Sequence, residues 1–195
     1  MQQETNKKYI IIENETKNFF GHTLYRIQAI KDFANVKAGD KGGWIEKEEN
    51  LSQEGNCWVY GDSKVFDNAE IRDNAKVFTS SEVYGNAKVF DNAKIFAFSS
   101  VYDNSVVCND AQVYGHAVIC GDAEVTSEED YFVFEDDIDY LCNFTYTKSN
   151  KKWKTETFYG NDKELIKNGY EINVEYGKMY ETCVNFIKQQ EETEK

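Results

Sequence analysis

The sequence predicts a mainly β protein built as a β-solenoid, and two regularities of the chain carry this prediction. Between Gly55 and Thr126 the chain divides without remainder into twelve consecutive hexapeptides. Their fifth residue is always valine or isoleucine, and their third is always alanine, serine or cysteine. Residues three and five of an extended strand face the same side, so every hexapeptide contributes a small and a β-branched side chain to a common interior.

The first two positions of the hexapeptides predict corners between short strands. They are mostly glycine, aspartate or asparagine, which tolerate turn and left-handed backbone geometry. A strand of about four residues cannot bury its apolar side alone, but stacked repeats bury it continuously. We therefore expect a solenoid over residues 55–126, an N-terminal cap over residues 1–54 and a C-terminal module over residues 127–195.

Hexapeptides of this kind resemble those of the left-handed parallel β-helix in hexapeptide-repeat proteins. The resemblance implies three hexapeptides in each triangular coil, and hence about four regular coils in this chain. The runs LYRIQAIKDF (Leu24–Phe33) and KAGDKGGWIEKEENLSQEGNCWVYGD (Lys37–Asp62) are also similar to uncharacterised bacteriophage and prophage proteins, which are loosely labelled as transferases. A label inherited from a fold does not establish an activity.

The N-terminal cap is expected to contain a hairpin and one degenerate coil. Strands are predicted at about Tyr9–Glu13 and His22–Ile30, with the polar residues Asn14–Asn18 between them. The next eighteen residues, Lys37–Glu54, have the length of one further coil. Their phase is degraded, because aliphatic residues stand where alanine or serine is expected, at Ile45 and Leu51. A degenerate terminal coil keeps a solenoid from exposing its open end.

If hexapeptides eighteen residues apart stack, the outward sixth positions form columns. The first aromatic column is Tyr60, Phe78, Phe96 and Tyr114, and the second aromatic column is Phe66, Tyr84 and Tyr102, ending at Cys120. Stacked aromatic pairs stabilise a sheet by roughly 0.2–1 kcal/mol each. Two apolar columns on one surface also predict a cover, which is another subunit, a partner or the C-terminal module.

Corner residues of the coils predict a structural ladder with one interruption. Asparagine and aspartate recur at the second position, and amides repeated at strand spacing can hydrogen-bond along the stack. The hexapeptide AFSSVY breaks this pattern with Ala97 and Phe98, on the corner that continues to His116. The break predicts either a bulge packed under a cap or part of a site.

Period six ends at Thr126, and the rest of the chain predicts a small α+β module. Strands are expected at Tyr131–Glu135 and about Asn143–Lys148, the latter pairing with Trp153–Tyr159. A short helix through Asn168 would be capped by Asn161 or Asp162. A final helix is expected from Gly177, with an apolar face made by Met179, Cys183, Phe186 and Ile187.

The formal charge of −13 indicates which partners to expect. An acidic surface repels nucleic acid and anionic membranes, but it attracts a basic groove on another protein. Calcium is not expected, because the EF-hand spacing and its glycine are missing, and no other metal site is predicted. The candidate partner-binding residues belong to the acidic segment that follows the solenoid: Glu128, Glu129, Asp130, Glu135, Asp136, Asp137 and Asp139.

The five cysteines show no CxxC spacing, and the first residues lack the apolar core of a signal peptide. A reducing cytoplasm, that of an infected or lysogenic bacterial cell, fits both observations. Acyltransferases that share the solenoid fold are typically trimers with a catalytic histidine and an acyl-CoA between subunits, as the resemblance implies. The chain has two candidates for that base, His22 in the cap and His116 at a corner.

The sequence favours a non-catalytic protein that acts by binding another protein, with no cofactor. One concrete version is an acidic mimic of nucleic acid that inhibits a host nucleic-acid-handling or anti-phage defence protein, for example a CRISPR-type protein. The alternatives are an acyltransferase that uses acetyl-CoA or another acyl-CoA, with His116 or His22 as the base, and a purely structural scaffold. In each case we expect a homo-oligomer, either a dimer or a trimer.

Overall fold

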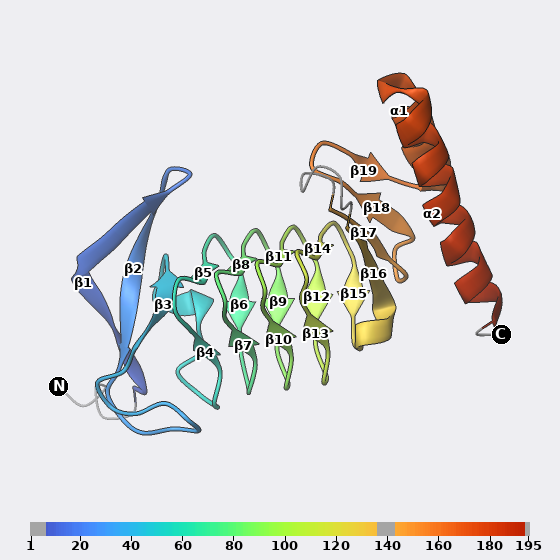
Figure 1. Ribbon diagram of the computed structural model, residues 1–195. Helices are drawn as coiled ribbons and strands as arrows, with labels where there is room; N and C mark the ends of the chain where they lie inside the picture. Colours follow the sequence, from blue (N-terminus) through green and yellow to red (C-terminus); the bar gives the residue numbers. More distant parts are fainter. Residues whose placement is uncertain (1–6, 136–142, 194–195) are drawn as a thin grey trace.

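The computed structural model describes residues 7–135 and 143–193, and these form a mainly β protein around a parallel β-solenoid. In Figure 1 the solenoid lies between an N-terminal hairpin at one end and a C-terminal module of four strands and two helices at the other. No helix among the described residues is long and apolar enough to cross a membrane.

The solenoid consists of two-residue strands, one for each hexapeptide, arranged in three parallel stacks. The first stack contains β4 (Trp58–Val59), β7 (Lys76–Val77), β10 (Lys94–Ile95) and β13 (Gln112–Val113). The second contains β5 (Lys64–Val65), β8 (Glu82–Val83), β11 (Ser100–Val101) and β14 (Val118–Ile119). The third contains β6 (Glu70–Ile71), β9 (Lys88–Val89), β12 (Val106–Val107) and β15 (Glu124–Val125).

Each strand pairs in parallel with the strand three hexapeptides further on, as Val59 with Val77 and Val65 with Val83 illustrate. Three hexapeptides therefore make one coil, and the predicted solenoid is confirmed. The interior is also as predicted, because the small third residues and the β-branched fifth residues of the coils are all buried. The hydroxyls of Ser63 and Ser81 lie in this interior without a hydrogen-bond partner among the described residues.

The cap coil differs in phase from the prediction. Strand β3 (Lys41–Ile45) pairs in parallel with β5, which places Ile45 beside Val65, and Leu51 forms a bridge with Ile71. Both residues therefore occupy the fifth position of a hexapeptide, not the third. The coil is two residues longer than a regular one, and the short 3₁₀ helix η1 (Glu48–Asn50) precedes Leu51. With this cap coil the solenoid has about five turns, which are the four predicted regular coils and the predicted degenerate one.

The hairpin is longer than predicted. Strand β1 runs over Tyr9–Phe19 and pairs antiparallel with β2 (His22–Ala29), with a bulge between Ile12 and Thr16. The predicted turn at residues 14–18 is wrong, because these polar residues belong to the strand at the edge of the sheet. The chain reverses at Phe20 and Gly21, whose φ angles are 47° and 90°. Strand β2 pairs antiparallel with β3, which joins the hairpin to the second stack.

The C-terminal module packs on the far end of the solenoid. Four antiparallel strands form its sheet, and α1 and α2 lie against one another beside it (Figure 1). Val118 of the last coil donates its N–H to the Thr145 hydroxyl at 2.9 Å, which joins the two parts. The elements are η2 (Glu128–Asp130), β16 (Tyr131–Phe134), β17 (Phe144–Thr147), β18 (Lys152–Lys154), β19 (Tyr159–Gly160), α1 (Asp162–Ile172) and α2 (Val174–Thr193).

The helices follow the prediction in kind but not in extent. The side chain of Asn161 caps α1, accepting hydrogen bonds from the N–H groups of Lys163 and Glu164, and the helix continues four residues past the expected end. Helix α2 begins before the expected Gly177. Its buried face is centred one residue away from the predicted one, so that Phe186 is 42% exposed while the buried side chains are Tyr180, Val184 and Ile187.

Candidate active site

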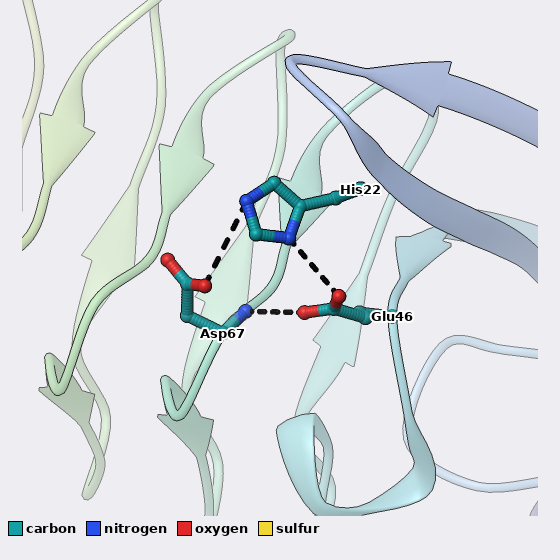
Figure 2. Close-up of side chains that lie close together, drawn as sticks. All are labelled: His22, Glu46 and Asp67. Carbon is teal, nitrogen blue, oxygen red and sulfur yellow. Dashed lines mark hydrogen bonds and ion pairs between the residues drawn. The ribbon is translucent and has the colours of Figure 1, made fainter.

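His22, Glu46 and Asp67 form a cluster where the hairpin meets the solenoid, and we call them the histidine cluster (Figure 2). His22 begins β2, directly after the tight turn of the hairpin. Glu46 directly follows β3, and Asp67 follows Phe66 one coil further on. The displaced phase of the cap coil places Glu46 in the column that continues with Phe66, and this brings its carboxylate to Asp67.

Both carboxylates of the cluster face the imidazole ring. Nδ1 of His22 donates a hydrogen bond to Oε1 of Glu46 at 3.0 Å, since a carboxylate can only accept. Oε2 of the same Glu46 accepts the backbone N–H of Asp67 at 2.7 Å. On the other side of the ring, Nε2 of His22 lies 3.7 Å from Oδ1 of Asp67. The His22 side chain is 29% exposed, so solvent and small molecules can reach it.

These contacts shift the titration of the cluster. The hydrogen bond to Glu46 is the largest cause that raises the pKa of His22, and the negative charges of Glu46 and Asp67 add to it against the opposing effect of desolvation. For Glu46, burial raises the pKa, but the hydrogen bonds from His22 and from the Asp67 backbone outweigh it and hold the pKa below its usual value. A carboxylate that accepts from Nδ1 fixes the tautomer in which Nε2 is the base.

The three side chains also have the composition of a metal site, and their ligand atoms lie within 4.8 Å of one another. In the observed arrangement, however, the two ring nitrogens of His22 face two different carboxylates. A single ion held by all three residues would require the hydrogen bond to Glu46 to break. The arrangement therefore fits proton transfer better than metal binding.

The second aromatic column begins at the histidine cluster. The ring of His22 lies 4.9 Å from that of Phe66, which stacks on Tyr84 at 4.9 Å with an angle of 5° between the planes. Tyr84 stacks on Tyr102 at 4.7 Å and 9°. The three aromatic rings stack as predicted, and the imidazole stands at one end of their row.

His116 lies at the other end of the same solenoid face. It occupies a corner with a φ of 57° and stacks on Phe98 at 5.4 Å. Among the described residues, its ring has no hydrogen bond or ion pair. A cleft of about 410 Å³ joins it to the second aromatic column and to the C-terminal module, and the lining includes Tyr84, Phe98, Tyr102, His116 and Lys154. The AFSSVY corner is thus part of this cleft, and it has no inserted residue.

The first aromatic column is also continuous. Phe78 and Phe96 stack at 5.0 Å and 2°, Phe96 and Tyr114 at 5.2 Å, and Tyr60 meets Phe78 edge-on. Its last ring, Tyr114, meets the Tyr131 ring of the C-terminal module edge-on at 6.5 Å, and the Tyr131 hydroxyl donates to the Gln112 carbonyl and accepts the Tyr114 N–H.

The acidic segment is only partly described. Glu128, Glu129 and Glu135 line a cleft of about 510 Å³ beside Tyr114. The carboxylate of Asp130 instead turns inward, where it accepts hydrogen bonds from the N–H groups of Thr126 and Ser127. Asp136, Asp137 and Asp139 lie outside the described residues.

Sequence reasoning found His22 but missed Glu46 and Asp67. The signal that would have revealed them is the pair Ile45 and Leu51, since aligning these with Val65 and Ile71 moves Glu46 into the second aromatic column. Asp67 looked like one more corner residue, which it also is. Its Oδ2 accepts the N–H of Gly85 in the next coil at 3.2 Å.

No protein-family model matches the chain. The chain is 50% identical over 52 residues to the uncharacterized acetyltransferase YdcK of Escherichia coli K12. This match covers 26% of the chain and 16% of the relative's length.

Proposed function

We propose that this protein is an acyltransferase that uses His22 as its general base. The observation that carries the proposal is the hydrogen bond from Nδ1 of His22 to Glu46, which leaves Nε2 to accept a proton. The partial relative named as an acetyltransferase and the solenoid fold support the same class of reaction. His116, the other candidate base, has no orienting carboxylate among the described residues.

In the proposed reaction, a nucleophile bound beside Nε2 attacks the carbonyl carbon of an acyl-CoA thioester. His22 takes the proton that the nucleophile loses, and Glu46 stabilises the imidazolium that forms. When the tetrahedral intermediate collapses, the carbon–sulfur bond breaks and the imidazolium returns its proton to the sulfur. The products are the acylated acceptor and free CoA, and His22 is again neutral.

We further propose that the active form is a homotrimer, because the cluster is open to solvent and the fold's acyltransferases bind the thioester between subunits. Light scattering with and without acetyl-CoA tests this part. A mass near three times 22.6 kDa that acetyl-CoA stabilises is expected. A monomer that is indifferent to acetyl-CoA would contradict it.

The catalytic test is the release of CoA thiol from acetyl-CoA in the presence of a panel of amine and hydroxyl acceptors. His22→Gln should lower kcat by about 100-fold or more, the usual contribution of a general base. His116→Gln is the matched control and should keep most of the activity. A His22→Gln protein with full activity would exclude this base, and a wild-type protein inactive with the whole panel would contradict the proposed function.

A second candidate function is binding of a basic partner protein in the bacterial cytoplasm, such as a host nucleic-acid-handling or defence protein. The observation that favours it is that Glu128, Glu129 and Glu135 share one cleft. Polylysine is a suitable probe for calorimetry. Glu128→Lys with Glu129→Lys should abolish its binding, while Glu70→Lys, on β6 in the first regular coil, should not. Equal loss in both variants would indicate a general charge effect.

A further inference from the structure

We propose that the acceptor of the transferred acyl group is an extended aliphatic amine with more than one positive charge, of the polyamine class, lying along the second aromatic column. This inference rests on the proposed function, since it names the substrate of the same site. It is carried by a row of carboxylates that accompanies the aromatic rings between the two ends of the solenoid face.

The carboxylates come from the corner that directly follows the second aromatic column. Its first positions are Asp67, Gly85, Asp103 and Gly121 in successive coils. Each aspartate binds the next coil in the same way, with Oδ2 accepting the N–H of Gly85 at 3.2 Å and of Gly121 at 3.0 Å. Two carboxylates are therefore fixed on one edge of the column, two coils or roughly 10 Å apart.

The carboxylates of this row are close enough to the column to affect the pKa of a tyrosine in it. The pKa of the Tyr84 hydroxyl is raised to about 12 by burial and, next, by the nearby charges of Glu82 and Asp103, with Asp67 adding to them. Lys64 compensates Glu82 through an ion pair at 2.9 Å. Among the described residues, Asp103 has no cationic partner, and Asp67 faces only Nε2 of His22, at 3.7 Å.

The lysines that the described residues place beside the column have hydrogen-bond acceptors, and Lys47 donates to the Asn68 side chain at 3.0 Å. Lys64 is held by Glu82, and its ammonium lies 4.4 Å from the ring centre of Phe19. Lys154 in the neighbouring cleft donates to the backbone carbonyl of Glu156 at 3.1 Å, and Glu156 lines the same cleft. Asp67 and Asp103 thus offer two carboxylates without a lysine or arginine partner among the described residues, which favours a cationic ligand over an anionic or a neutral one.

The column itself fits the aliphatic part of such a ligand. Its rings stack face to face along the solenoid axis, so the half-buried Tyr84 and Tyr102 present their edges to the surface, whereas Phe66 at the end of the column is only 5% exposed. Ring edges form an apolar track on which methylene groups pack, whereas a flat sugar or base would need an exposed face. An aliphatic chain with ammonium groups at intervals matches both the track and the carboxylates beside it.

The track leads to the proposed base. One ammonium near Asp67 lies beside Nε2 of His22, while a second reaches Asp103. The first ammonium releases one proton to solvent, and the neutral nitrogen attacks the thioester carbon to form the carbon–nitrogen bond. Its second proton passes to Nε2 and then to the departing CoA sulfur. The balance is one amide, one free thiol and one released proton.

Transfer from acetyl-CoA is measured with spermidine and with an uncharged alkanediol of matched length. Turnover with spermidine and little with the diol is expected. Turnover with the diol alone would overturn this inference and leave the proposed acyl transfer intact. If no acceptor reacts, the proposed function fails, and calorimetry with spermidine alone then decides whether the column binds polyamines.

The discriminating variant is Asp103→Asn, which lies two coils from the base. It should raise the KM for spermidine, or its Kd in calorimetry, by about fivefold, the upper range for an exposed charge pair, without changing kcat. Asp91→Asn is the matched control, since Asp91 Oδ2 accepts the N–H of Asn109 at 3.0 Å on a different corner. Equal effects of both variants, or none from Asp103→Asn, would overturn the inference.

Discussion

The ammonium of Lys8 donates a hydrogen bond to the carbonyl oxygen of Cys57 at 2.9 Å and lies 3.2 Å from the sulfur of the same residue. Lys8 also donates to the carbonyl oxygen of Glu54, and its side chain is only 1% exposed. These carbonyls belong to the two-residue-longer stretch that closes the cap coil. The lysine thus satisfies the backbone acceptors where the regular ladder of coils begins.

We predict that Lys8→Met lowers the free energy of unfolding by about 2–4 kcal/mol, because buried carbonyls lose a charged donor. Urea unfolding followed by circular dichroism measures the change. Lys7→Met is the matched control, since Lys7 forms only a surface ion pair with Glu48 and should cost less than about 1 kcal/mol. Equal stability of the two variants would contradict the role given to Lys8.

The histidine cluster predicts a pH-dependent contribution to stability. Because the folded pKa of His22 is raised, its stabilisation is complete below the unfolded value of about 6.5 and is lost as the pH rises through the folded value. Because the pKa of Glu46 is lowered, its own contribution is lost only below its usual value of 4.5. Urea unfolding across pH should show the largest difference between wild type and His22→Gln between these two pH values.

In the Glu46→Gln protein, the same comparison should give a smaller pH-dependent difference, because the largest cause of the raised His22 pKa is gone and only the charge of Asp67 remains. A wild-type advantage that grows with pH above the usual histidine value would have the wrong sign.

Gly55 is predicted to be irreplaceable, whereas Gly61 is not. Both have left-handed backbones, with φ angles of 66° and 58°. A Cβ at Gly55 would collide with the carbonyl oxygen of Asp73, while a Cβ at Gly61 meets no atom within 4 Å. Gly61→Ala should cost about 1–2 kcal/mol from the backbone alone, and Gly55→Ala clearly more. Thermal melts of the two variants decide between them, and equal losses would exclude the steric term.

The side-chain amides of the asparagine ladder all donate in one direction along the solenoid, so substitutions in its middle and at its acceptor end should differ in cost. Asn56 donates to Asn74, Asn74 to Asn92, and Asn92 to Asp110, each at 3.0 Å. Asn74→Asp removes a donor in the middle of this chain and should cost about 1 kcal/mol. Asp110→Asn at its acceptor end should be nearly neutral. Chemical unfolding compares the two, and an equal cost would mean that the ladder has no direction.

The regular part of the fold was predictable from the sequence, because the hexapeptides repeat one pattern of corner residues and buried residues. The third and fifth residues define the interior, and the eighteen-residue stacking that the family resemblance implied fixed both aromatic columns. The pairing of Phe66 with Tyr84 and the amide ladder from Asn56 needed no further information.

The candidate site was not predictable in the same way, because it depends on contacts between segments that the repeat does not govern. His22, Glu46 and Asp67 meet only because the hairpin turns at Gly21, not among the preceding polar residues, and because the cap coil is two residues longer. The local sequence does not favour a turn at Gly21 over one at the polar residues before it, and it does not show that the cap coil is two residues longer than the others. The shifted helix face around Tyr180 has the same origin, since its partner is the C-terminal sheet.

Because the coils pair in parallel register, each coil adds one strand spacing to the length of the solenoid. The histidine cluster is attached to the N-terminal coil, and the cleft beside His116 is attached to the last one, so the separation between them is set by how many coils lie in between. Adding or removing eighteen residues would change that separation by one strand spacing, roughly 4.8 Å, without altering either end. The number of coils therefore sets the distance between the histidine cluster and the cleft beside His116.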